Sequence, residues 1–169
     1  MTLDEAKQKF IHAWGGLGTK WGINKTMGQI HALLFIAPDP LSTEEIMDTL
    51  QISRGNVNMN VRELMDWGLV QKVYKTGERK DFYVAEKDVW KVAKQIVKER
   101  KKREIEPIIE LLAELEATKA DGDAEDYKAF MDSVANLKHF TENVDKSVDK
   151  IMRADENWLF ENLLNIIKK

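Results

Sequence analysis

The fold is decided by residues 42–68, STEEIMDTLQISRGNVNMNVRELMDWG. Ser42 and Glu45 have the spacing of a capping box, which predicts a short helix that begins at the next residue. After a tight connection, Ser53 is a suitable N-cap for a second helix, and Gly68 is a suitable stop for it. Two helices joined by so short a turn predict a helix-turn-helix.

After Gly68 the pattern changes period, and Leu69, Gln71, Val73 and Lys75 alternate between apolar and polar side chains. A turn-forming segment, Thr76–Arg79, separates them from the β-favouring run Phe82–Val84. A hairpin that directly follows a helix-turn-helix makes a winged helix. We therefore expect a winged helix-turn-helix DNA-binding domain over residues 1–86, within a fold that is mainly α with one small β-hairpin.

A first helix is expected upstream, over residues 3–21. Its apolar residues recur every three or four positions after a gap, as on one buried stripe: Leu3, Phe10, Trp14, Leu17 and Trp21. Glycines at 15, 16, 18 and 22 weaken its second half, which either frays or lets another backbone approach closely. A second short helix, with Met27 and Ile30 on its apolar side, must end before Pro38.

The remainder, residues 87–169, is predicted to be helical and to form a dimerisation and effector region, with the first helix shared in the dimer interface. Pro107 either kinks one helix or starts another. The polar stretch Ala117–Glu125 is expected to be a linker, and a last helix is expected over Glu156–Lys168. Between them, apolar residues step alternately by three and four, as in an a/d seam: Tyr127, Phe130, Val134, Leu137, Thr141, Val144, Val148 and Ile151.

The composition excludes several functional classes. The 169 residues include no cysteine, which rules out a disulfide scaffold, a thiol nucleophile and any cysteine-ligated metal site. No apolar run approaches the ~20 residues that a membrane-spanning helix needs, and residues 1–8 are too polar for a signal peptide. We expect a cytoplasmic protein with no membrane contact.

Charge is uneven along the chain. Residues 1–104 carry 18 basic and 14 acidic side chains, whereas residues 105–169 carry 8 basic and 15 acidic ones. The net charge of −3 therefore hides a positive first part and a negative second part, which indicates different roles. Five cations crowd into Lys98–Glu104, either as a solvated helix face or as an attraction for phosphate.

The helix that Ser53 opens has an outer face suited to DNA bases, because its apolar residues turn inward. Arginine reads guanine and asparagine reads adenine through paired hydrogen bonds, and an apolar side chain can touch a thymine methyl group. The predicted base-reading residues are Arg54, Asn56, Asn58, Met59 and Arg62, with Gly55 lowering the bulk of the face and Asn60 at its edge. The alternative is a solvated helix in a module that contacts protein.

Other cations are candidates for contacts with the DNA backbone. The hairpin tip can reach phosphates or the minor groove, although lysines at a hairpin edge also serve solubility. The start of the second helix favours a phosphate through its amides and dipole, with ordinary capping by Asn24 or Thr26 as the alternative. The predicted backbone contacts are Lys25, Thr26, Ser53, Lys75, Arg79 and Lys80.

Four stretches resemble the GbsR-type branch of the MarR-like winged-helix transcriptional regulators. They are WGINKTMGQIH at 21–31, ISRGNVNMN at 52–60, DWGLV at 66–70 and GERK at 77–80. The resemblance extends from about Phe10 to Glu104 and is much less specific after Ile105. It implies a dimeric DNA-binding regulator of bacterial or archaeal type, with Lys75–Asp81 as the wing. Some relatives in this family control osmoprotectant uptake or synthesis and respond to small quaternary amines.

No catalytic, cofactor or metal site is predicted. The three histidines lack the spacing of metal ligands, and His31 is expected to pack between helices. Nothing resembles a nucleophile elbow, a P-loop or a dinucleotide fingerprint. A cage for a quaternary ammonium effector needs several rings around one cation, and its candidates are Trp14, Trp21, Trp67 and Trp90, although aromatic residues at helical spacing usually belong to a core.

The sequence thus predicts a sequence-specific DNA-binding regulator, expected to be a repressor, that acts as a homodimer. Two-fold symmetry predicts a pseudo-palindromic operator with half-sites about one helical turn apart, or a multiple of it. A small osmolyte-like effector is expected near the junction of the two regions. The alternatives are a winged-helix module that binds protein, and an enzyme for which no convergent acid, base or nucleophile is found.

Overall fold

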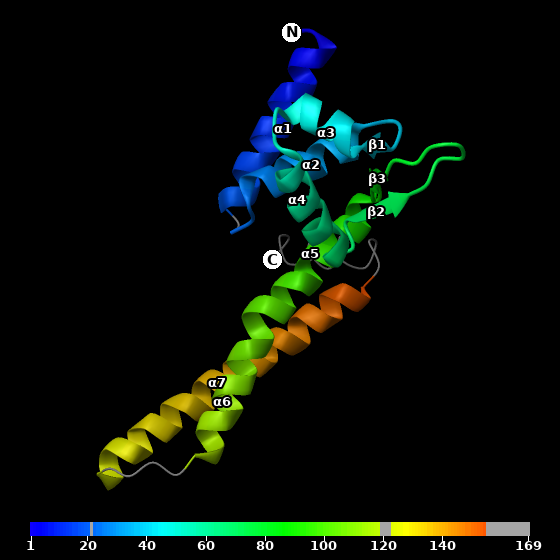
Figure 1. The fold of residues 1–169 in the computed structure, drawn as a ribbon. Coiled ribbons are helices and arrows are strands. Elements are labelled where there is room, and N and C mark those ends of the chain that lie inside the picture. The colour runs from blue at the N-terminus through cyan, green and yellow to red at the C-terminus, as the bar shows by residue number, and fades with distance from the viewer. Residues whose placement is uncertain (21, 119–122, 155–169) are drawn as a thin grey trace. The chain divides into compact units, whose positions relative to one another are not determined.

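The computed structural model describes residues 1–20, 22–118 and 123–154, and this part of the chain is mostly helical (Figure 1). The chain divides into two compact units, Met1–Gln95 and Ile96–Lys169. The first unit contains α1 (Leu3–Lys20), α2 (Lys25–Ile36), β1 (Leu41–Ser42), α3 (Thr43–Leu50), α4 (Arg54–Asp66), β2 (Val70–Val73), β3 (Phe82–Ala85) and most of α5 (Val89–Arg100). The second contains the end of α5, a π-helical segment η1 (Lys101–Ile105), α6 (Glu106–Ala117) and α7 (Ala124–Arg153).

The helix-turn-helix of α3 and α4 forms as the sequence predicts. The Ser42 hydroxyl accepts a hydrogen bond from the Glu45 amide at 3.3 Å, and the Glu45 carboxylate accepts one from the Ser42 amide at 2.7 Å, which completes the capping box. Gln51, in the left-handed conformation with φ 53°, ends α3. The Ser53 hydroxyl then accepts from the Asn56 amide at 3.3 Å and opens α4.

The end of α4 is a Schellman motif. The amide of Gly68 donates to the carbonyl of Met65, and the amide of Leu69 donates to the carbonyl of Leu64, both at 2.9 Å. Gly68 has φ 69°, a conformation that costs glycine little and a residue with a side chain much more. The predicted stop is therefore confirmed, and the chain turns directly into β2.

The predicted hairpin is present, in a sheet with one strand more than the sequence predicts. β2 and β3 are antiparallel, with Val70 opposite Ala85 and Val73 opposite Phe82. β1 pairs with the other side of β3, so that the strand order is β1-β3-β2. Two residues are too few to show a period, and Ser42 already carries the capping signal, so nothing in the sequence marked β1 as a strand.

α1 forms as predicted, but it buries a different stripe. Leu3 and Leu17 are 74% and 43% exposed, whereas Ile11, Gly15 and Gly18 are buried. The prediction was wrong because the contact with the next helix runs through glycines, which an apolar period does not detect.

Close approach of two backbones explains the glycines of α1. A Cβ atom added to Gly28 of α2 would lie 3.1 Å from the Cα atom of Gly15, and one added to Gly15 would lie 3.0 Å from the carbonyl oxygen of Lys25. The second half of α1 stays helical to Lys20. Of the two interpretations left open, close packing is confirmed and fraying is not.

Aromatic side chains flank the contact between α1 and α2. The Trp14 ring lies 5.6 Å from the Phe10 ring and 6.3 Å from the imidazole of His31, which lies 6.0 Å from the Phe35 ring. Burial lowers the pKa of His31 to about 4, and the charge of Lys87 acts in the same direction. His31 is therefore a neutral residue of the core at pH 7, packed between helices as predicted.

Lys87, just beyond β3, closes the C-terminal end of α2. Its Nζ atom donates to the carbonyl oxygens of Leu34, Phe35 and Ala37 at 2.7, 2.6 and 2.8 Å. These carbonyls belong to the helix end, where intrahelical partners are lacking and a positive charge is favoured. The contact ties the hairpin to the helical core of the first unit.

Pro107 lies in the first turn of α6, directly after η1. Glu106, just before it, donates its backbone amide to the carbonyl of Lys101, five residues back, as in a π-helix. The chain therefore stays helical from Val89 to Ala117, through a π-helical segment, and Pro107 starts α6 rather than breaking a single α-helix.

Part of the basic cluster of residues 98–104 joins helices of the second unit. The Nζ atom of Lys101 lies 3.1 Å from Asp145 and 2.6 Å from Asp149, both on α7. The hydrogen bond to Asp149 raises the pKa of Lys101, and Asp145 adds to the effect. Lys101 is only 15% exposed and is paired with α7, so this cation of the cluster is neither part of a solvated face nor available to a phosphate.

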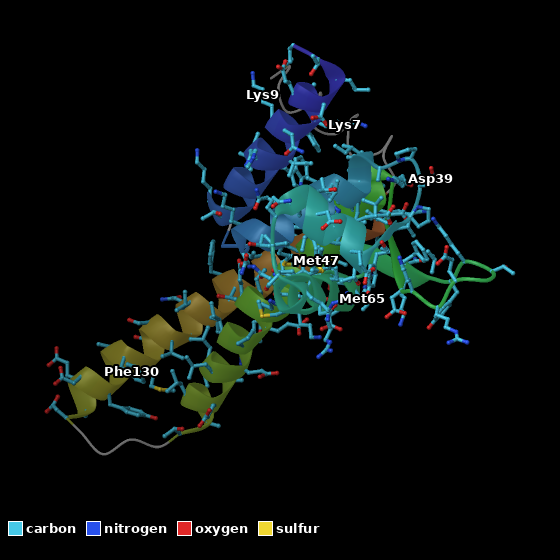
Figure 2. The ribbon with its side chains drawn as sticks, turned by 45° about the horizontal axis from the view of Figure 1, so that its top comes forward. Lys7, Lys9, Asp39, Met47, Met65 and Phe130 are labelled. Carbon is cyan, nitrogen blue, oxygen red and sulfur yellow. The ribbon has the colours of Figure 1, made fainter. Side chains whose placement is uncertain are left out.

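α7 packs on α6 through half of its predicted seam. In the column of positions 127, 134, 141 and 148, Val134 and Thr141 are buried. In the column of positions 130, 137, 144 and 151, Phe130 (labelled in Figure 2), Leu137 and Ile151 are 47%, 51% and 43% exposed. The predicted linker joins the end of α6 at Ala117 to the start of α7 at Ala124, with its central residues 119–122 outside the described residues, as is the helix predicted over 156–168.

Candidate nucleic-acid interface

The outer face of α4 is exposed at the positions that the sequence assigns to base reading. Val57, Val61 and Leu64 face inward and are at most 1% exposed. Among the predicted base readers, Arg54, Asn58, Met59 and Arg62 are exposed and Asn56 is half-buried. A Cβ atom added to Gly55 would meet nothing within 4 Å, so this glycine is not needed for packing within the unit.

Asn60 does not belong to this face. It is 1% exposed, and its Nδ2 atom donates to the backbone carbonyl of Asn56 at 2.8 Å and to the side-chain oxygen of Asn56 at 2.9 Å. The placement of Asn60 at the edge of the face was wrong. Its spacing from Val57 and Leu64 is the spacing of a buried stripe, which a polar side chain obscured.

Arg54 has an acidic partner across the turn. Its Nη2 atom donates to Oε1 of Glu44, in the first turn of α3, at 2.6 Å. This hydrogen bond lowers the pKa of Glu44, and the charge of Lys80 contributes in the same direction. Arg54 begins the candidate recognition helix, and its guanidinium is therefore held by a residue of α3.

An open polar hollow of about 320 Å³ lies between α3 and the wing. Its α3 side carries Glu44, Glu45 and Asp48, which we call the acidic edge of α3, and its wing side carries Lys75 and Lys80 together with one carboxylate, Glu78. Hydrogen bonds to Ser42 are the main cause that lowers the pKa of Glu45, and the two lysines add to it. The wing cations are thus set against carboxylates on the same side of the unit.

The wing presents its cations to different degrees. The loop that joins β2 and β3 extends away from the sheet (Figure 1), and Arg79 and Lys80 on it are exposed. Lys75 is tied back: its Nζ atom donates to the carbonyl of Pro40 at 3.3 Å and lies 4.2 Å from the centre of the Phe82 ring. Arg79 and Lys80 are therefore better placed than Lys75 to reach a phosphate.

The start of α2 is capped by the chain itself. The side-chain oxygen of Asn24 accepts a hydrogen bond from the Thr26 amide at 2.8 Å. The amide of Thr26 is thus occupied, as in the capping alternative, while the side chain of Lys25 is exposed and that of Thr26 half-buried.

The predicted effector tryptophans lie on separate elements. Trp14 belongs to α1, Trp67 is buried where α4 ends, and Trp90 is half-buried on α5 with the Nζ atom of Lys94 5.4 Å from its ring centre. Trp21 lies outside the described residues. An effector site at these residues stays a prediction.

Metal sites and membrane-spanning helices were also sought among the described residues. No group of three or more histidine, aspartate or glutamate side chains among them could hold a metal ion. No helix within the described ranges is long and apolar enough to cross a membrane.

The ion pair of Arg54 and Glu44 is the main feature of this surface that sequence reasoning missed. The two residues are ten positions apart and belong to different helices, so no helical spacing relates them. Two signals were available. The turn is so short that the start of α4 must lie beside α3, and the first turn of α3 is acidic whereas α4 begins with an arginine.

Comparison with known proteins matches the chain to bacterial regulators. The MarR family profile matches residues 21–79. The chain is 24% identical over 115 residues to the HTH-type transcriptional repressor GbsR, 25% over 88 residues to the putative HTH-type transcriptional regulator YvaV, and 27% over 70 residues to the HTH-type transcriptional repressor OpcR, all from Bacillus subtilis strain 168. These matches cover 68%, 52% and 41% of this chain, and 63%, 50% and 38% of the relatives' lengths.

The fold has a counterpart among solved structures. A crystal structure described as that of a transcriptional regulator superposes with a TM-score of 0.65 at 15% identity, covering 87% of this chain and 95% of that one. At this identity the likeness concerns the fold alone, which is a winged helix with additional helices.

Proposed function

We propose that this chain, whose residues 21–79 match the MarR family profile, acts as a sequence-specific DNA-binding transcriptional regulator. α4 enters the major groove as the recognition helix and the loop between β2 and β3 acts as the wing. Two copies bind a pseudo-palindromic operator, because a symmetric dimer presents two equivalent recognition helices. The names of two relatives, both repressors, favour repression over activation.

The observation that carries this proposal is the character of the outer face of α4. The face is exposed, polar and free of acidic residues from Arg54 to Arg62, and it includes a 59% exposed methionine. The space beside Gly55 on this face is open, because no atom of the first unit lies within 4 Å of the point where a Cβ atom would stand. A helix surface with arginine, asparagine and an apolar side chain matches the donors, acceptors and methyl groups of base edges in the major groove.

The residues divide into two roles. Base reading is assigned to Arg54, Asn56, Asn58, Met59 and Arg62, and contact with the DNA backbone to Lys25, Thr26, Ser53, Lys75, Arg79 and Lys80. Within the second group, the exposure of Arg79 and Lys80 supports them most directly, whereas the Thr26 amide and the Lys75 ammonium already have partners in the chain.

The second unit is proposed to join two copies. The column of α7 that contains Phe130 and Leu137 is half exposed and continues the seam by which α7 packs on α6. A second copy of the same surface would cover it. A small osmolyte-like effector, bound near the tryptophans named above, would then change the distance between the two recognition helices.

The proposal is tested by selection from random duplex DNA with the full chain. We expect one enriched pseudo-palindromic sequence, bound with an affinity that falls steeply as salt rises. Arg54→Ala should cost about 1–3 kcal/mol on that sequence and relax one position of it. Lys80→Ala should weaken binding to all sequences alike and lower the salt slope by about 1.

Two results would contradict the proposal. One is no enrichment over random DNA, and the other is binding that does not respond to salt, which is the behaviour of a winged-helix module that contacts protein instead. An equal loss on every sequence for Arg54→Ala would remove its assignment as a base reader.

A further inference from the structure

The ion pair between Arg54 and Glu44 connects two fixed points. Glu44 lies in the first turn of α3, whose start is held by the capping box and whose end is set by the left-handed Gln51. Arg54 is the first residue of α4, which the Ser53 hydroxyl caps. Because both residues stand on capped helices joined by a three-residue turn, their backbones are held close together, and the Glu44 carboxylate lies within hydrogen-bond distance of the Arg54 guanidinium.

The geometry leaves Arg54 able to read a base while it is anchored. The hydrogen bond to Glu44 uses one N–H of Nη2. A guanidinium has five N–H donors in one planar fork, and a bidentate contact with guanine needs two of them. The Arg54 side chain is 58% exposed and that of Glu44 39%, so the remaining edge of the fork is accessible to a ligand.

We infer that Glu44 is a positioning residue that determines sequence specificity, because it holds the guanidinium of Arg54 in the orientation from which Arg54 reads one base pair. This inference rests on the proposed function. A free arginine side chain samples many rotamers and can bind any phosphate within reach, whereas an anchored one loses less conformational entropy on binding and is directed to one edge.

Glu44 also has a second effect, which must be separated from the first. Its negative charge lies on the acidic edge of α3, beside the surface that meets DNA, and repels every phosphate backbone. Asp48 shares this repulsion because it is exposed on the same helix and lines the same hollow. Asp48→Ala is therefore a matched control that removes an equal charge and leaves the anchor of Arg54 in place.

The experiment uses the full chain and the operator obtained by selection from random DNA. Affinity is measured at one salt concentration for the operator, for its single-base-pair variants and for an unrelated duplex. The proteins compared are the wild type, Glu44→Ala, Glu44→Gln, Asp48→Ala, Arg54→Ala and the double variant Glu44→Ala/Arg54→Ala. Circular dichroism confirms that each is folded.

We expect Glu44→Ala to raise the affinity for unrelated DNA about twofold to threefold through its charge, and to lower the preference at the base pair read by Arg54 about fivefold to tenfold. Glu44→Gln keeps an oxygen that accepts from Arg54 and should retain part of that preference. Asp48→Ala should raise the affinity for unrelated DNA to the same degree and keep the preference. With Arg54→Ala already present, Glu44→Ala should change the preference no further, since the two residues act together.

The inference is overturned if Glu44→Ala keeps the full preference at the base pair that Arg54→Ala relaxes, or if Asp48→Ala loses it equally. Failure of the proposed function has a different appearance, because the wild type itself would then select no DNA sequence.

Discussion

The two units of the chain bury their apolar side chains to very different extents. In Met1–Gln95, large side chains from four helices are almost completely buried: Ile11, Met27, Ile30, Leu34, Ile46, Val57, Val61 and Leu64. In the described part of the second unit, only Leu112 and Val134 are buried among the hydrophobic residues. Four large apolar side chains of α7 and two of α6 are more than two-fifths exposed there.

The difference comes from geometry more than from composition. Helices α1 to α4 and the sheet surround one interior, so each can bury a wide face. α6 and α7 form a pair in which each helix covers one stripe of the other. The winged-helix unit therefore has a complete core. In the helical pair, α7 has two apolar columns and α6 covers only one of them, so the second column needs a further apolar partner.

Gly28→Val should break the complete core with the largest effect. Even a Cβ atom at this position would lie 3.1 Å from the Cα atom of Gly15, and valine adds two methyl groups beyond it. α1 must then move away from α2, and we expect the free energy of unfolding to fall by roughly 4 kcal/mol. Urea unfolding followed by tryptophan fluorescence measures this, because Trp14, Trp67 and Trp90 lie in the first unit.

Gly16→Ala is the control for Gly28→Val. Gly16 lies in α1 beside the contact, and a Cβ atom there meets nothing within 4 Å. Alanine at this helical position should raise the free energy of unfolding by about 0.5–1 kcal/mol. Equal stability of the Gly28→Val variant and the wild type would mean that the two helices do not approach through their glycines.

Acid should weaken the same core through His31. Its pKa is lowered from 6.5 to about 4 in the folded protein, mainly by burial. Between these pH values the unfolded chain binds a proton at His31 that the folded chain does not, so the stability that His31 contributes falls as pH falls from 6.5 to 4, and this loss is complete below pH 4. The full loss is about 3 kcal/mol, from 1.36 kcal/mol per pKa unit.

Urea unfolding at several pH values between 7 and 5 isolates this contribution. Glu44 and Glu45 have lowered pKa values, so the stability they contribute is lost only as pH falls below the ordinary carboxyl value of 4.5. His31→Leu should flatten the curve between pH 7 and 5. A slope that persists unchanged in this variant would assign the acid sensitivity to another group.

Local signals made most of the winged helix predictable. The capping box at Ser42, the cap at Ser53 and the left-handed Gly68 each act over a few residues, and each is confirmed. The contact of Gly15 with Gly28 was not predictable from periodicity, because glycine has no side chain to appear in an apolar pattern. β1 was missed because its pairing with β3 is a long-range contact between very short segments.

The candidate interface was predictable in outline and less so in detail. The helical period places Arg54, Asn58 and Arg62 on one side of α4, and they are exposed. The same period places Asn60 on the buried stripe, where its polarity was misleading. The pairing of Arg54 with Glu44 depends on how the turn between α3 and α4 folds, which no spacing in one helix reports.

The smallest expected effect concerns the cover of the helical pair, which we propose to be a second copy. Phe130→Gln with Leu137→Gln makes the exposed column of α7 polar and leaves the column with buried Val134 unchanged. Self-association should weaken by about 2 kcal/mol, roughly 30-fold in Kd, measured by analytical ultracentrifugation. Tyr74→Gln, which removes a 79% exposed ring from the wing, is the control and should leave Kd unchanged.

A wild type that is monomeric at every concentration, and that associates only when residues 155–169 are deleted, would assign the cover to that segment of the same chain. Loss of association on mutation, with the first unit's unfolding unchanged, would instead place the dimer contact on the column that α6 leaves open.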